Sequence, residues 1–237
     1  MTLVILTAFG VGLATSLGGI LGFIFKGVAE RYGGVMMAIS SGVMLACSFT
    51  SLISPAFEIS GSPYLVTLGI MLGGGVIFAF DKVIRRFDIG ESDEKRHIIL
   101  FVLAMALHNL PEGIASGVGF GLGDVGEAIS IAVSVAVQNI PEGMVIIAPL
   151  LSLGIGHRRT LLIAFLTGAV EIVGAFLGYF FVAGFSALLP FALSFAGGTM
   201  VYVIYSEMSE GSDGERGFLG LVFLLGTALM LLFSAVI

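Results

Sequence analysis

Uncharged apolar stretches of roughly twenty residues recur along the whole chain, and they restrict its fold more than any other feature. A helix of about 20 apolar residues is long enough to cross the hydrocarbon core of a bilayer. Only 11% of the 237 residues are charged, against about 25% in a typical soluble domain. The sequence therefore predicts an all-α polytopic membrane protein.

We predict eight transmembrane helices, and two of the assignments have a competing interpretation. A signal peptide competes for the first span, but that apolar run is too long and lacks a basic start. The boundary between the sixth and seventh spans is apolar, although Gly184, Ser186 and Pro190 suit a tight turn. The predicted spans are about 2–25, 34–57, 63–81, 98–121, 128–153, 160–182, 186–207 and 217–236.

All ten lysines and arginines fall in alternate loops, on one side of the predicted membrane. Positive charge marks the cytoplasmic side, so we expect both termini to be extracytoplasmic. We expect residues 1–237 to form a single transmembrane domain in the plasma (inner) membrane, surrounded by lipid. The acidic pI of about 4.9 and the scattered basic residues exclude a nucleic-acid surface.

Two similar motifs place a proline and a glutamate inside apolar spans: ALHNLPEG at Ala106–Gly113 and AVQNIPEG at Ala136–Gly143. Glu112 and Glu142 each come close to the middle of a span. A carboxylate at that depth costs at least ~2.5–3.5 kcal/mol, so such residues normally face an interior or an aqueous path. No predicted span contains a lysine or arginine, so a structural salt bridge does not explain Glu112 and Glu142.

Each motif glutamate lies one helical turn from two polar side chains. Residues three and four apart share a face of a helix, so the polar groups and the carboxylate point the same way. Imidazole nitrogen with amide and carboxylate oxygen suits Zn²⁺, Fe²⁺, Mn²⁺ or Co²⁺. The amides have a second interpretation, because polar side chains in spans also hold helices together. The polar neighbours are His108 and Asn109 before Glu112, and Gln138 and Asn139 before Glu142.

The prolines of the two motifs should kink their helices. Pro111 and Pro141 cannot donate a backbone hydrogen bond, and each frees the carbonyl four residues earlier. Since the fourth and fifth predicted spans are antiparallel, the motifs form an inverted pair that meets near the midplane, as in secondary transporters. A row of small residues on the fourth span should also permit close contact with a neighbouring helix: Gly113, Gly117 and Gly121.

Glu171 stands alone in the sixth predicted span. A carboxylate at such a depth is a functional candidate by default, because its burial is costly. We therefore include Glu171 among the residues expected to meet a cation that crosses the membrane.

With these motifs and this topology, the chain resembles the ZIP (Zrt/Irt-like) family of divalent metal transporters, and its bacterial GufA-like branch in particular. The resemblance extends over essentially the whole chain. It implies uptake of Zn²⁺ into the cytoplasm, with Fe²⁺, Mn²⁺, Co²⁺ or Cd²⁺ as other cargoes, and no cofactor. It further implies a homodimer in which a four-helix unit carries the metal past a scaffold by alternating access.

The resemblance also implies two adjacent metal sites that share the two motif glutamates. The first would use His108, Glu112 and Glu142, joined by Met44 of the second span. Glu207 matches a glutamate of the seventh span on the exit side. The second site would add the remaining polar residues, which are Asn109, Gln138, Asn139 and Glu171.

The chain departs from the family pattern at the second site. Many relatives have histidine at the position of Gln138, and some have aspartate at that of Asn139, so this site is less charged here. Glu171 is followed by Ile172, where the family commonly has proline.

Two other functions remain open from the sequence. A passive cation channel could use the same buried carboxylates, and its flux would resist saturation. A membrane-embedded metalloenzyme is the other alternative, but intramembrane zinc proteases use H-E-x-x-H, which is absent from this sequence. We therefore expect a transporter and not an enzyme.

Overall fold

The computed structural model describes residues 1–84, 106, 109–120, 125–152, 154–209 and 216–236, and nearly all of them are helical. Seven helical segments in this part of the chain are long and apolar enough to cross a membrane. The protein is thus an all-α polytopic membrane protein, as predicted. The predicted span 98–121 lies mostly outside the described residues, although 109–119 are helical. The number of eight spans therefore stays a prediction.

Most ends of the described helices lie within a few residues of the predicted bounds, but the helix of the second span begins at Lys26, well before the predicted start at about residue 34. The predicted turn between the sixth and seventh spans is present, because α7 ends at Gly184 and a short 3₁₀ helix follows. The elements are α1 (Thr2–Ile24), α2 (Lys26–Cys47), a π-helix (Ser48–Ile53), α3 (Ser54–Ser60), α4 (Pro63–Ile84), α6 (Val125–Ser152), α7 (His157–Gly184), a 3₁₀ helix (Ser186–Leu188), α8 (Leu189–Ser209) and α9 (Arg216–Val236).

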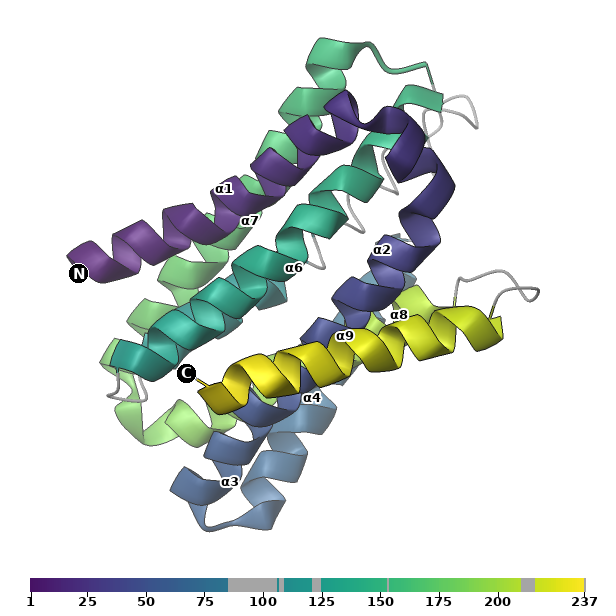
Figure 1. The fold of residues 1–237 in the computed structure, drawn as a ribbon. Helices are drawn as coiled ribbons and strands as arrows, with labels where there is room; N and C mark the ends of the chain where they lie inside the picture. The colour runs from purple at the N-terminus through teal and green to yellow at the C-terminus, as the bar shows by residue number, and fades with distance from the viewer. Residues whose placement is uncertain (85–105, 107–108, 121–124, 153, 210–215, 237) are drawn as a thin grey trace.

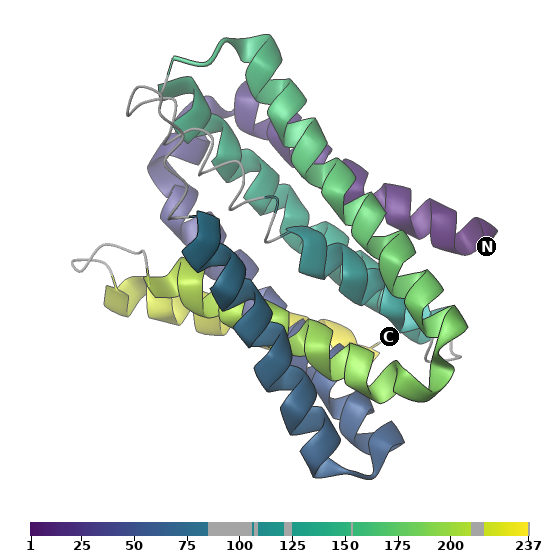
Figure 2. The ribbon, with the colours of Figure 1, turned by 180° about the vertical axis from the view of Figure 1, so that it is seen from behind.

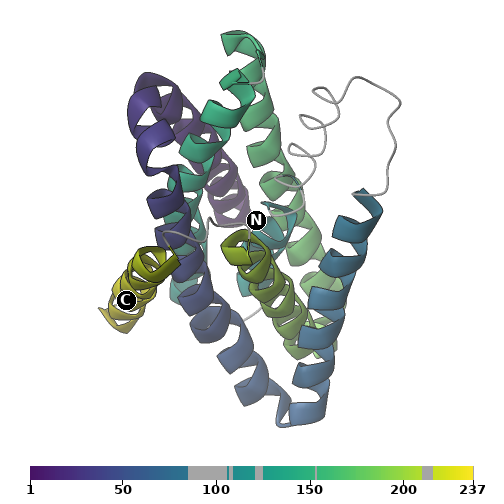
Figure 3. The same cartoon turned by 90° about the vertical axis from the view of Figure 1, so that its right-hand side faces the viewer.

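The predicted second span consists of three consecutive helical pieces, α2, the π-helix and α3 (Figure 3). Pro55 near the start of α3 has no N–H, so the carbonyl of Ser51 loses its usual α-helical donor. The wider π-helical turn lies just before this proline, and local π-helical adjustments can satisfy the backbone groups that a proline frees in a membrane helix. After α3 the chain reverses at Gly61, whose positive φ of 58° suits glycine.

The helices form two groups that meet along α2 and α6. In the first group α1 packs on both α6 and α7 (Figure 1). In the second group α4 packs on α8, which Figure 2 shows from behind, and α9 packs on α2. Among the helices whose bounds are given above, the groups contact one another chiefly where α2 lies against α6. Burial of apolar surface contributes little to the association of helices in a membrane, so such contacts depend on close packing of small residues.

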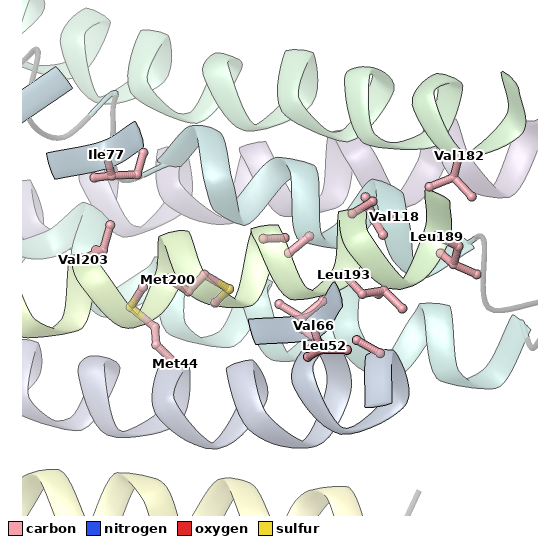
Figure 4. Packing of buried hydrophobic residues seen from close by; sticks show 14 of the residues in the cluster. Met44, Leu52, Val66, Ile77, Val118, Val182, Leu189, Leu193, Met200 and Val203 are labelled. Atoms are coloured by element: carbon pink, nitrogen blue, oxygen red, sulfur yellow. The ribbon is translucent and has the colours of Figure 1, made fainter. Parts of the chain in front are cut away.

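A large apolar cluster fills the second group and reaches into the first. Met44 of α2 and Met200 of α8 both lie within it, and Leu193 lies further along α8 (Figure 4). Ala115 and Val118 of the helical residues 109–119 also belong to this cluster. The outer faces of the helices expose many large apolar side chains, as expected for a multi-pass protein of the cell membrane.

Candidate metal site

The side chains of three glutamates are buried between the helices. Glu112 lies in the helical residues 109–119, Glu142 on α6 and Glu171 on α7, with 0%, 2% and 0% of their surfaces exposed. The prediction that these carboxylates avoid the lipid is confirmed. Because burial of a carboxylate among apolar helices is costly, each one requires polar surroundings.

Glu171 accepts hydrogen bonds from three helices. Asn109 donates from its Nδ2 to Oε1 over 2.5 Å, and Asn139 of α6 donates from its Nδ2 to Oε2 over 2.6 Å. Thr15 of α1 donates its hydroxyl to Oε1, also over 2.5 Å. Hydrogen bonds to a carboxylate are shorter and stronger than those between neutral groups. A single side chain of α7 therefore connects α1, the helical residues 109–119 and α6.

Glycines let the helices come close enough for these bonds. A Cβ on Gly113 would meet the backbone of Glu171, and one on Gly117 would meet the backbone of Ala175. The predicted close contact of the fourth span with a neighbour is confirmed for these two glycines, and the neighbour is α7. Gly121 lies outside the described residues. The close approach brings Asn109 within reach of Glu171.

Glu142 has a different partner, on the other group of helices. Ser40 of α2 donates its hydroxyl to Oε1 of Glu142 over 2.6 Å. The same hydroxyl lies 3.3 Å from the carbonyl oxygen of Gln138, one turn earlier on α6. Ser40 of α2 therefore binds a motif glutamate of α6 where these two helices are in contact.

The amides of both motifs present polar atoms that nothing in the described part of the chain satisfies. The Oδ1 atoms of Asn109 and Asn139 are buried without a hydrogen-bond partner there, and so are both amide atoms of Gln138. An unsatisfied buried polar group costs about 1–3 kcal/mol. Such groups in a native protein require an explanation, and an ion or water that they would coordinate is a physical one.

Two predicted site residues have side chains outside the described part of the chain, and a third packs among apolar residues. His108 lies outside the described residues, as does the side chain of Glu207, whose backbone is part of α8. Met44 is fully buried, but it packs in the apolar cluster with Met200. Within the described ranges, no three His, Cys, Asp or Glu side chains form a group that could hold a metal ion. The full ligand set therefore stays a prediction.

Thr15 and Ser40 were not predicted from the sequence. Serine and threonine are common in membrane helices, where many of them bond only to their own backbone. Thr199 of α8, for example, donates to the carbonyl of Ala196 in the same helix. Nothing in the sequence separates such a residue from Thr15, whose partner is 156 positions away along the chain.

The helices and their buried glutamates define a polytopic membrane protein with a polar centre between its spans. Comparison with known proteins agrees with this class. A family model described as "ZIP Zinc transporter" matches residues 91–234. The chain thus belongs to the ZIP family and is similar to its GufA-like members.

Individual relatives cover most of the chain. The zinc transporter GufA of Myxococcus xanthus is 34% identical over 87% of this chain and 86% of its own length. The zinc transporter ZupT of Chlorobaculum parvum is 31% identical over 93% and 94%. The zinc transporter ZIPB of Bordetella bronchiseptica is 29% identical over 82% of this chain and 68% of its own length.

Proposed function

We propose that the protein carries divalent transition-metal cations across the cell membrane into the cytoplasm, with Zn²⁺ as the main cargo. The observation that carries this proposal is the burial of three carboxylates between helices, together with amide oxygens that have no partner in the described part of the chain. Membership of the ZIP family and the names of three relatives as zinc transporters support it. The same membership supports a transporter and not an enzyme.

The proposed ligands are the residues predicted from the sequence. Carboxylate and amide oxygens together with the imidazole of His108 suit Zn²⁺, and also Fe²⁺, Mn²⁺, Co²⁺ or Cd²⁺. The bonds from Asn109 and Asn139 to Glu171 support a shared site, because they bring both motifs to one carboxylate. The full proposed set is Met44, His108, Asn109, Glu112, Gln138, Asn139, Glu142 and Glu171, with Glu207 further along the pathway.

We propose alternating access as the mechanism, within one transmembrane domain of eight spans with both termini outside. The division of the helices into two groups that meet along α2 and α6 supports a movement of one group against the other. Kinks at Pro111 and Pro141 belong to the same proposal, although α6 is one continuous helix through Pro141. A homodimer is proposed from the family resemblance.

The test is metal influx into proteoliposomes that contain a zinc-sensitive dye, with the native chain compared with Glu142→Ala. We expect saturable influx of Zn²⁺ that the variant loses, because the variant lacks a carboxylate at the centre of the site. Glu58→Ala is the matched control, since Glu58 is an exposed carboxylate on α3 and its loss should not change influx.

The outcomes separate the candidate functions. Influx that does not saturate would replace the carrier with a passive channel. No influx of Zn²⁺, Fe²⁺, Mn²⁺ or Cd²⁺ into liposomes that contain folded protein would overturn transport and favour a membrane-embedded metalloenzyme. Influx that survives Glu142→Ala would keep transport and show that the site lies elsewhere.

A further inference from the structure

We infer that a recess between α7, α8 and the helical residues 109–119 binds an acyl chain of a membrane phospholipid. The recess has a volume of about 340 Å³, within the range of ~300–1,000 Å³ that ligand pockets have. None of the proposed metal ligands is among its described lining residues, so the site is separate from the one for the cargo. The inference therefore goes beyond the proposed function and does not depend on it.

The lining residues of the recess form a buried floor and an exposed rim. Val118, Gly178 and Ala192 are buried, and the last two have little or no side chain. Leu177 and Phe181 of α7 are 56% and 39% exposed. Short residues at the floor and large apolar ones at the edge leave room for a slender apolar group that enters from outside the molecule.

The recess exists because three helices approach one another unequally. Gly178 lets α7 lie directly against the helical residues 109–119, since a Cβ there would meet the carbonyl oxygen of Ile114. On the other side, α8 presents Phe191 and Phe195 to the same space, and their ring centroids are 6.1 Å apart. Beyond the short 3₁₀ helix that connects them, α7 and α8 run in different directions (Figure 2). Bulky rings and diverging axes keep α8 away from α7, and the space between them stays open.

The chemistry of the lining excludes polar occupants. Every lining residue that the structure describes is glycine, alanine, valine, leucine, isoleucine or phenylalanine. A water molecule in a cavity needs about two to four polar partners, whereas apolar cavities stay dry or bind apolar molecules. A lipid headgroup or a hydrated metal ion would lose its hydrogen bonds here without replacement. The occupant is therefore a hydrocarbon.

The depth of the recess in the membrane indicates the acyl part of a lipid. The helix α7 has 28 residues and is about 42 Å long, as thick as a bilayer with its headgroup regions (~40–45 Å). Gly178 lies six residues before the end of α7 at Gly184, or about 9 Å along the helix axis. Each headgroup region is only about 5–8 Å deep, because the hydrocarbon core takes up ~30 Å. The recess thus opens just below the headgroups, on the extracytoplasmic side of the predicted topology.

The rim of the recess is continuous with the surface that meets the membrane. Phe181 packs on Phe185 with ring centroids 5.7 Å apart, and Phe185 is 60% exposed. Large exposed apolar side chains on membrane-spanning helices face lipid tails, so the tails reach the edge of the recess. A phospholipid can therefore insert one chain between α7 and α8 while its headgroup stays at the membrane surface.

The experiment uses a phosphatidylcholine that carries a diazirine in one acyl chain, added to the purified full-length protein in detergent. After illumination, the labelled peptides are mapped by mass spectrometry. We expect saturable labelling of the start of α8, at Phe191 and Phe195, and about a tenfold loss when a roughly tenfold excess of unlabelled phosphatidylcholine competes. The exposed face of α9, at Leu224 and Leu225, is the internal control, because labelling there should neither saturate nor be competed.

A variant that fills the recess provides the second measurement. Ala192→Trp adds bulk at the floor and should remove most of the saturable labelling. The matched control is Ala228→Trp, which places the same bulk at an exposed alanine of α9 and should leave the labelling of α8 unchanged. A thermal melt of each variant reports folding, and Ala192→Leu replaces Ala192→Trp if the latter does not fold.

Two results in folded protein would overturn the inference. The first is labelling of α8 that does not saturate, or that persists in the variant at Ala192, because the chain would then meet only the outer surface. The second is saturable labelling that appears only after the protomers of a dimer have been separated, which would assign the recess to a second copy of the chain. Neither result bears on metal transport, which is measured by influx.

Discussion

The two groups of helices are packed in the same way but differ in their interiors. Around α7, glycines bring the backbones together and the space between the helices holds a carboxylate with three hydrogen-bond donors. Around α8, glycines again bring the backbones together, but the interior contains methionine, leucine and valine. Close packing thus determines the fold in both regions, while the polar side chains of one region determine its chemistry.

Substitution of a contact glycine in each region should have the largest effect. Gly117→Leu would force a side chain into the backbone of α7, and Gly73→Leu of α4 would do the same to α8 near Phe195. We expect both variants to lose most of the monodisperse protein in size-exclusion chromatography of detergent extracts. Gly10→Leu is the control, because nothing lies within 4 Å of its position. A large loss in one region alone would show that the regions are not packed alike.

A carboxylate placed in the apolar region should have the next largest effect. Met200→Glu has nearly the same length of side chain, but the apolar cluster provides none of the donors that surround Glu171. We expect a loss of at least ~2.5–3.5 kcal/mol of stability, seen as a lower melting temperature. Met200→Leu conserves volume and should cost less than ~1.5 kcal/mol. Equal melting temperatures for both variants would mean that the apolar region tolerates charge.

Removal of the hydroxyl at the boundary between the groups should have the smallest effect. Ser40→Ala loses the hydrogen bond to Glu142, so we expect Zn²⁺ influx to need about threefold to tenfold more metal for half-maximal rate. Ser48→Ala is the control on the same span, since the Ser48 hydroxyl bonds to the carbonyl of Met44. An unchanged half-maximal concentration in Ser40→Ala would show that Glu142 does not need this partner.

The sequence predicted the fold well because its signals were local. Span length and the row at Gly113 and Gly117 both follow from short stretches of chain. The burial of Glu112, Glu142 and Glu171 was predicted for the same reason, since a charge inside an apolar run has few alternatives.

The partners of these carboxylates could not be predicted. Thr15 and Ser40 lie on α1 and α2, and their bonds depend on how helices distant in sequence are placed side by side. The π-helix at Ser48–Ile53 was missed as well. Pro55 was the available signal, but a proline in a span predicts a disturbance and not its form.

The π-helix has a consequence for how α2 and α3 are directed. An α-helix advances about 100° per residue, so one additional residue in a wide turn rotates everything beyond it by roughly that angle. Before the π-helix α2 contacts α8 as well as α6 and α9, whereas beyond it α3 contacts α8 and α4. The wide turn therefore changes which helices this membrane crossing faces: its first part contacts both groups, and its last part contacts the group of α4 and α8.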